Sequence, residues 1–196
     1  MQPDDDQAAT PLMDATRFLA GQTFEEFLST AVKYRELWTL GARRATVPAD
    51  VIETFSQLTS PVRLVALNED WCLDAVGVLP YVAKLAEECP LVDFRNFGRD
   101  ANPDLMDAHL TGTSRSIPVV IAYDSDWTEL GWWGPRPTEL QRWVMTEGAI
   151  MPKPEKYHYM RQWYARDHGA TPLREIAATV TDALAARAVR TAATAG

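Results

Sequence analysis

The stretch PVRLVALNEDWCLDA, residues 61–75, decides the fold of this chain. Residues 62–67 form a short, mostly apolar run between turn-forming residues, which is typical of a buried strand. Over residues 71–88 the apolar spacing becomes helical, with an interruption at Pro80. The sequence therefore predicts a strand that turns directly into a helix, and it places Cys72 at the junction.

The region after this junction alternates between strand and helix patterns. The expected elements are a strand over 91–97, a helix over 103–110, a strand over 119–123, a hairpin strand over 127–133 and a helix over 137–146. This order predicts that the first two strands are parallel through a right-handed crossover and that the last two form a hairpin. The fold class is therefore α/β, with a mixed sheet of four strands.

Helical segments flank this kernel, which spans about residues 60–148. Thr23 and Glu26 match a capping box at the start of a helix expected over 23–40. We expect a single domain of residues 1–196, with helical extensions over 12–59 and 154–189 on either side of the kernel. Further helices are expected over 48–58, 155–168 and 172–189. The tails over 1–11 and 190–196 are expected to be flexible.

Composition and charge exclude several classes of protein. The chain has 196 residues with a net charge of −8, and its Lys and Arg residues form no cluster, which argues against nucleic acid or an anionic membrane as partner. No run of apolar residues is long enough for a transmembrane helix, and the acidic start has no signal-peptide pattern. Two cysteines are too few for a disulfide scaffold. We expect a cytoplasmic protein.

Cys72 is the candidate reactive residue. Unpaired backbone N–H groups and the positive end of a helix dipole would favour the thiolate at a strand-to-helix junction. The alternative is a buried and inert cysteine, which is the more frequent fate of a free thiol. The position beside Trp71 favours the functional interpretation.

Around Cys72 the sequence resembles the thioredoxin family. Trp71-Cys72 stands where that family has the Trp-Cys of its redox motif, and Pro80 stands where thioredoxins kink the active-site helix. Ser116-Ile117-Pro118, just before a strand, looks like the cis-proline loop that faces the active cysteine. The resemblance implies a thioredoxin-like fold with extra terminal helices, and a cis Ile117–Pro118 bond against Cys72.

A narrower resemblance is to a bacterial thioredoxin-like subfamily with a Trp-Cys-x-Asp-Cys or Trp-Cys-x-Asp-Ala motif. Its other marks are Ser-Ile-Pro, Trp-Gly-Pro-Arg-Pro at 133–137 and Trp-Tyr-Ala-x-Asp at 163–167. The likeness covers about residues 20–180. It implies that Trp71, Ile117 and Pro118 form an apolar groove that holds a substrate's extended backbone beside the sulfur.

The second cysteine of a dithiol motif is absent, because Ala75 takes its place. A dithiol enzyme needs that cysteine to release the mixed disulfide. Cys89 lies 17 residues further along the expected helix, or about 25 Å away, whereas a disulfide requires Cα atoms roughly 4.4–6.8 Å apart. A dithiol mechanism within one chain is therefore excluded, and we expect negligible reduction of insulin disulfides.

A further departure is Ala66, where thioredoxins carry a buried aspartate that serves as a proton shuttle. Asp70 and Asp74 lie close to Cys72 in sequence, and their charges oppose thiolate formation. Arg115 would offset them if it reached across from the Ser-Ile-Pro loop; the alternative is an exposed loop arginine of little consequence.

Neither the histidines nor the cysteines show metal-ligand spacing, so we expect no metal and no cofactor. The C-terminal half of the chain is aromatic, which indicates packing of the last helices on the sheet or, alternatively, a partner surface such as a homodimer interface. The aromatic residues concerned are Trp132, Trp133, Trp143, Trp163, Tyr157, Tyr159 and Tyr164.

Two functions of different class remain open. The first is thiol–disulfide exchange through a single mixed disulfide at Cys72, with a protein thiol or disulfide or a low-molecular-weight thiol as partner. The second is a non-catalytic binding or adaptor module that uses the same groove. For the first we expect modest activation of Cys72 and a faster reaction than at Cys89, which lies at a helix C-terminus beside Glu87 and Glu88.

Overall fold

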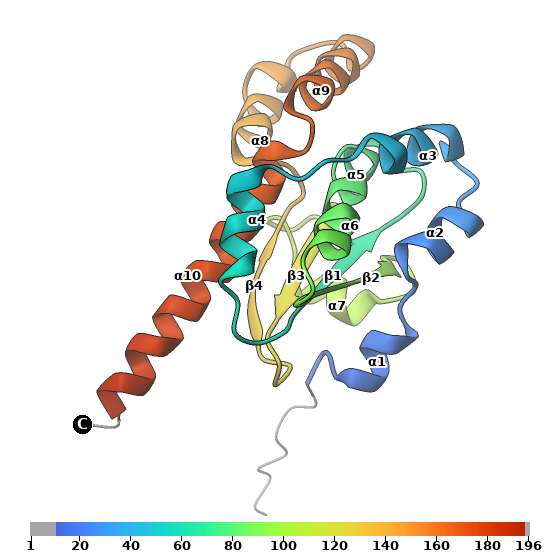
Figure 1. The fold of residues 1–196 in the computed structure, drawn as a ribbon. Coiled ribbons are helices and arrows are strands. Elements are labelled where there is room, and N and C mark those ends of the chain that lie inside the picture. The colour runs from blue at the N-terminus through green and yellow to red at the C-terminus, as the bar shows by residue number, and fades with distance from the viewer. Residues whose placement is uncertain (1–10, 195–196) are drawn as a thin grey trace, which may run out of the picture.

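Four strands form a mixed sheet in the order β2-β1-β3-β4 (Figure 1). The computed structural model describes residues 11–194. The strands are β1 (Val62–Asn68), β2 (Val92–Gly98), β3 (Val119–Tyr123) and β4 (Glu129–Trp133). Strand β1 pairs in parallel with β2 and antiparallel with β3, which pairs antiparallel with β4. The predicted α/β class, the parallel first pair and the hairpin are confirmed.

Helices surround the sheet, and α8 and α9 stand together at the end where α5 lies (Figure 1). The helices are α1 (Ala15–Ala20), α2 (Phe24–Thr30), α3 (Arg35–Arg44), α4 (Ala49–Ser56), α5 (Leu73–Val76), α6 (Leu79–Glu88), α7 (Pro103–Ala108), α8 (Thr138–Met145), α9 (Lys153–Asp167) and α10 (Ala170–Thr194), with a 3-10 turn, η1 (Glu147–Ala149), after α8. No helix in the described part of the chain is both long and apolar enough to cross a membrane.

The core is centred on β1 and β3, which are buried along almost their whole length. Apolar side chains on both faces of these strands meet α-helices, as expected for a sheet that is covered on its two faces. Trp38 of α3 is fully buried, and its Nε1 donates a hydrogen bond of 2.9 Å to the backbone oxygen of Asp70. The loop that carries Cys72 is therefore held against α3.

The single helix expected over residues 23–40 is wrong, because α2 ends at Thr30 and α3 begins at Arg35. Tyr34 adopts a left-handed conformation in the break. Asp70 stabilises the break, since its carboxylate accepts hydrogen bonds of 2.8 Å from the backbone N–H groups of Val32 and Lys33. The carboxylate thus provides an acceptor for two backbone N–H groups in the loop between the helices.

The helical segment expected over residues 71–88 is also two helices. The break lies at Gly77 and Val78, and Pro80 sits in the first turn of α6, where a missing N–H costs nothing. A Cβ at Gly77 would lie 2.6 Å from the ring of Tyr164, so glycine lets α9 pack directly on α5. The break and the glycine together bring α9 over the Cys72 loop.

The structure describes only residues 190–194 of the C-terminal tail expected over 190–196. Helix α10 continues to Thr194, beyond the end of the helix expected over 172–189. The alanine-rich sequence explains this, because alanine has the highest helix propensity. Residues 195–196, and residues 1–10 of the other expected tail, lie outside the described residues.

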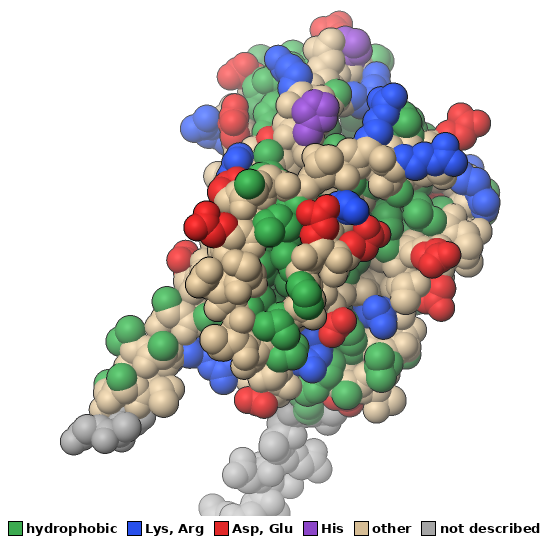
Figure 2. Space-filling view, viewed as in Figure 1, with side chains coloured by type: hydrophobic (Ala, Val, Ile, Leu, Met, Phe, Trp, Pro, Cys, Tyr) green, Lys and Arg blue, Asp and Glu red, His purple; other side chains and the backbone are tan. Residues whose placement is uncertain are grey.

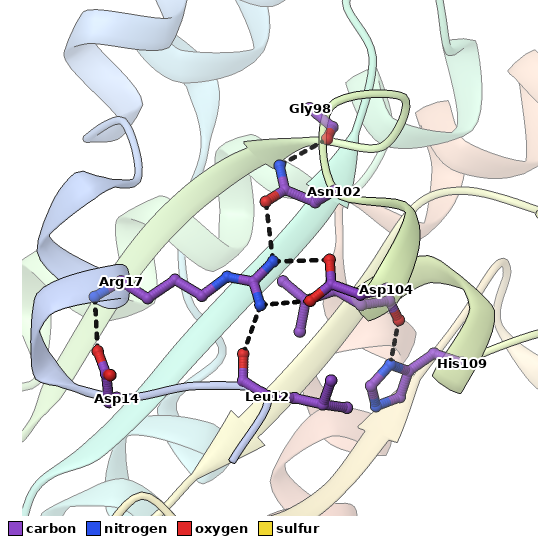
Figure 3. Close-up of polar contacts among 8 residues, drawn as sticks. Leu12, Asp14, Arg17, Gly98, Asn102, Asp104 and His109 are labelled. Carbon is purple, nitrogen blue, oxygen red and sulfur yellow. Dashed lines mark hydrogen bonds and ion pairs between the residues drawn. The ribbon is translucent and has the colours of Figure 1, made fainter. Parts of the chain in front are cut away.

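Helix α1 was not predicted from the sequence, and Arg17 fastens it to the chain segment around α7 (Figure 3). The guanidinium of Arg17 donates to both carboxylate oxygens of Asp104, at 2.6 and 2.9 Å. It also donates to the side-chain oxygen of Asn102 and to the backbone oxygen of Leu12. Asp14 caps the helix by accepting from the backbone N–H of Arg17.

We expect Arg17→Met to lower the free energy of unfolding by on the order of 1 kcal/mol, because a bidentate Arg–carboxylate pair is lost. Arg17 also lowers the pKa of Asp104 to about 2. The stabilisation is therefore complete above the ordinary carboxyl pKa of 3.8 and is lost as the pH falls toward 2. Urea unfolding at pH 7 and pH 2.5 measures both effects, and Arg43→Met, at an exposed α3 position, is the matched control.

Candidate functional site

Cys72 is the N-cap residue of α5 and follows directly on the loop after β1. Its side chain is 8% exposed, and its thiol donates a hydrogen bond of 3.4 Å to the backbone oxygen of Ile117. The Ile117–Pro118 peptide bond is cis. The structure thus brings the two segments singled out in the sequence, Trp71-Cys72 and Ser116–Pro118, against each other.

The thiol of Cys72 is not activated. Its pKa is raised to about 11, chiefly by burial and secondly by the negative charge of Asp74, against hydrogen bonds from the Ala75 and Asp74 backbone and the charge of Arg136. The expectation of modest activation is therefore wrong. Helix α5 has only one turn, so its dipole is small, and the loss of hydration outweighs it.

Asp74 is the buried acidic group beside the thiol. Arg136 forms an ion pair with it, with 2.6 Å between Nη2 and Oδ2, and the Tyr164 hydroxyl donates a hydrogen bond of 3.0 Å to Oδ1. Burial nevertheless raises the pKa of Asp74, because the desolvation of its charge outweighs both partners. These three side chains form what we call the Asp74 triad, and they come from α5, from the loop before α8 and from α9.

The triad gives a structural reason for the motifs at 133–137 and 163–167. Arg136 lies in the first of them and Tyr164 in the second, so three separated motifs meet at Asp74. Gly134 has a φ of 139°, and a Cβ there would lie 2.3 Å from the backbone oxygen of Pro118. Glycine is therefore required where the loop that delivers Arg136 crosses the Ser-Ile-Pro loop.

Of the three expected electrostatic modulators of Cys72, only Asp74 lies where it can act. The Asp70 carboxylate instead binds the backbone between α2 and α3. The Arg115 guanidinium donates two hydrogen bonds of 2.6 Å to Asp107, so it does not offset the acidic charge at the thiol. Arg136 is the residue that offsets the acidic charge at the thiol. The sequence signal for it is an arginine between two prolines in the motif at 133–137.

The three residues expected to form an apolar groove differ in their exposure. Trp71 is 45% exposed and lies under the guanidinium of Arg99, which is 5.0 Å from the ring centre. Ile117 is 6% exposed, and Pro118 is buried. Trp71 and Ile117 line the same cavity as Cys72, whereas Pro118 is not part of the lining.

That cavity has a volume of about 540 Å³, and we call it the Cys72 pocket. Helix α9 forms one side of it through Tyr157, Met160 and Tyr164. Its cationic lining residues are Arg99, Arg115, Arg136, Lys153 and Arg161. Among the described residues, Asp74 is the one carboxylate in the lining, and no group of three His, Cys, Asp or Glu side chains could hold a metal ion.

Cys89 lies apart from this pocket, at the C-terminal cap of α6. It is 4% exposed, and burial together with the charge of Glu88 raises its pKa. Cys72 and Cys89 are both free thiols. The structure offers Cys89 no route to a thiol intermediate on Cys72.

Several of the C-terminal aromatic residues pack inside the chain. Trp143 stacks on Tyr159 with 3.8 Å between ring centres. Trp133 donates a hydrogen bond of 2.6 Å from its Nε1 to Glu175 of α10. These contacts support the packing interpretation for Trp143, Tyr159 and Trp133, and they join α8 to α9 and β4 to α10.

Comparison with known structures shows the same fold in two solved chains. A protein of unknown function from Pseudomonas aeruginosa superposes with a TM-score of 0.69 at 17% identity, over 85% of this chain and 95% of that one. An HIV epitope scaffold superposes with a TM-score of 0.68 at 16% identity, over 86% of this chain and 97% of that one. No curated protein matches the chain.

A family model assigns the chain more directly. The model described as thioredoxin matches residues 21–163, which include β1, the Cys72 loop, the Ser-Ile-Pro loop and most of α9. The match extends over more than half of the chain, and the mixed sheet has the strand order and pairing described above. The chain belongs to the thioredoxin family.

Proposed function

We propose that this chain carries out monothiol thiol–disulfide exchange, in which Cys72 holds a substrate as a single mixed disulfide. The observation that carries the proposal is the position of the Cys72 thiol, in the wall of the pocket and next to the Ile117 backbone oxygen. A disulfide bound in the pocket would place one of its sulfur atoms next to the Sγ atom of Cys72. Membership of the thioredoxin family supports this chemistry.

The exchange balances without a further oxidant. Cys72 loses its proton to water, and its thiolate attacks one sulfur of a disulfide R–S–S–R′. The bond between Sγ and that sulfur forms as the original S–S bond breaks, and R′–S⁻ leaves and takes up a proton. A second thiol later attacks the mixed disulfide and restores Cys72, because Ala75 offers no internal nucleophile.

The raised pKa of Cys72 slows both the formation and the release of the mixed disulfide. Few thiolates exist at neutral pH, so attack is slow. A thiol of high pKa is also a poor leaving group, so the mixed disulfide resists release through the Cys72 sulfur. We propose that the adduct is released slowly, by the thiols that a reducing compartment such as the cytoplasm supplies.

We expect prolonged incubation with an excess of a small disulfide to add one mixed-disulfide mass to the Cys89→Ser variant and none to the Cys72→Ser variant. Intact mass spectrometry under native and then reducing conditions measures this. The wild-type chain should reduce insulin disulfides negligibly, since nothing within it resolves the adduct. An unmodified Cys72 after prolonged incubation, or rapid insulin turnover, would contradict the proposal.

The burial of Cys72 favours a second candidate function, namely a binding module that uses the pocket without redox turnover. In that case a ligand would bind equally well to the wild type and to Cys72→Ala. Thermal stabilisation by ligand distinguishes the two candidates, because a covalent adduct requires the sulfur and reversible binding does not.

A further inference from the structure

We propose that the Cys72 pocket selects small anionic disulfides or thiols, which carry carboxylate or phosphate groups, in preference to protein disulfides. This inference deepens the proposed function and rests on it. Two independent features support it: the way α9 encloses the pocket, and the excess of cationic side chains around it.

The enclosure limits the size of the substrate. Met160 and Tyr164 of α9 line the pocket beside Cys72 and are only 5% and 9% exposed, so α9 forms a packed wall on one side of the pocket. A protein disulfide would have to bring an extended backbone to a sulfur that is 8% exposed. The volume of about 540 Å³ instead lies within the range of roughly 300–1,000 Å³ that is usual for small-molecule sites.

The charge of the pocket is opposite to that of the whole chain. The chain has a net charge of −8, yet five of the pocket-lining side chains are Lys or Arg. The single carboxylate among the described lining residues, Asp74, is already paired with Arg136. At the end of the molecule formed by α3, α8 and α9, Figure 2 shows Lys and Arg side chains interspersed with Asp and Glu. A positive pocket on an acidic protein attracts anions selectively.

Two of the cations are available to a ligand. Arg115 is held by Asp107, and Arg99 is held by Asp100. Within residues 11–194, no carboxylate forms an ion pair with Lys153 or Arg161 of α9, and the Lys153 ammonium lies 5.8 Å from the centre of the Tyr157 ring.

The two available cations stand on the same helix that closes the pocket, so a ligand beneath α9 would have its anionic groups within their reach. Tyr34, Trp71 and Tyr157 add exposed aromatic surface at the rim, where the non-polar part of a ligand could rest. The pocket therefore offers these two cations, an apolar rim and a thiol in one cavity that is partly open to solvent.

The test compares small disulfides of different charge on the Cys89→Ser background. The probes are 5,5′-dithiobis(2-nitrobenzoate), which carries two carboxylates, neutral 4,4′-dithiodipyridine and cationic cystamine. Each rate at Cys72 is divided by the rate for the urea-unfolded chain, which removes the intrinsic reactivity of the probe. We expect the normalised rate to be highest for the anionic probe and lowest for cystamine.

Lys153→Gln combined with Arg161→Gln should lower the normalised rate of the anionic probe by about tenfold and that of the neutral probe by less than about twofold. Arg166→Gln is the matched control, because Arg166 is exposed on the same helix outside the pocket lining. It should change neither rate by more than about twofold.

The outcomes separate this inference from the proposed function. Labelling by all three probes with equal normalised rates overturns the anion preference and leaves the exchange at Cys72 standing. Failure of every probe to label folded Cys72 overturns the exchange itself. At constant ionic strength, protection from labelling by inorganic phosphate assigns a phosphate site, and protection by glutarate assigns a carboxylate site. If neither phosphate nor glutarate protects Cys72 from labelling, the pocket has no anion-binding site.

Discussion

Arg136→Met is expected to lower the free energy of unfolding by about 3 kcal/mol at pH 8, because the Asp74 carboxylate would remain buried without its cation. The Asp74 side chain is 9% exposed, and that of Arg136 is 20% exposed, so solvent screens the pair only weakly. Tyr164 would supply the remaining hydrogen bond, which does not compensate a buried charge. Chemical denaturation of wild type and variant measures the difference.

The pH dependence of this loss has a definite sign. Burial already raises the pKa of Asp74 above its ordinary value of 3.8, and removal of Arg136 raises it further. A carboxyl whose folded pKa lies above its unfolded value contributes stability that is complete below about pH 4 and is lost as the pH rises through the folded pKa. The deficit of Arg136→Met should therefore shrink between pH 8 and pH 4.

A double variant separates the charge from the packing. Asp74→Asn combined with Arg136→Met removes both charges and should recover most of the lost stability, since an uncompensated buried charge is the main cost. Arg142→Met is the control for a general arginine effect, because Arg142 is exposed on α8. Equal, small losses for Arg136→Met and Arg142→Met would refute a structural role for the triad.

The central fold could be predicted because its signals are local. The apolar run of β1, the turn at residues 124–126 and the hairpin strand after it each follow from neighbouring residues. Helix α1 and the break between α2 and α3 could not be predicted this way. They depend on Arg17 meeting Asp104 and on Asp70 meeting the backbone near Val32, which are contacts between segments far apart in the sequence.

For the candidate site, too, the sequence predicts local features but not the contacts between distant segments. Motif resemblance placed Cys72 against Ser116–Pro118, and the structure has them in contact. It did not assign Arg136 and Tyr164 to Asp74, because a motif gives residue types without their partners. The sign of the thiol pKa shift was also missed, since it depends on how completely α9 and its neighbours remove water from Cys72.

The second large effect concerns the reactivity of Cys72. In the Cys89→Ser variant, alkylation by iodoacetamide at pH 8 should be at least about a hundredfold slower for the folded protein than for the urea-unfolded chain. The thiolate fraction accounts for this factor, because the pKa is raised from its ordinary value of 9.0 to about 11. The alkylation rate of the folded protein should rise with pH toward a midpoint near 11.

Asp74→Asn tests the cause of this slow reaction. The negative charge of Asp74 raises the pKa of Cys72, so its removal should move the alkylation midpoint to lower pH. Arg136→Met should move the midpoint to higher pH, because Arg136 lowers the thiol pKa. Opposite shifts in these two variants cannot arise from loosened packing, which would speed alkylation in both.

Because the thiol pKa is raised, the free energy of unfolding should also fall as the pH rises through the alkaline range. A thiol whose folded pKa lies above its unfolded value contributes stability that is complete below about pH 9 and is lost as the pH rises toward 11. Cys72→Ala removes this contribution, so its stability should fall less steeply than that of the wild type over the same interval. Parallel stability curves, together with equal alkylation of folded and unfolded protein, would mean that water and reagent reach the sulfur freely. In that case the pocket would be an open groove, and the enclosure by α9 would no longer argue for a small substrate.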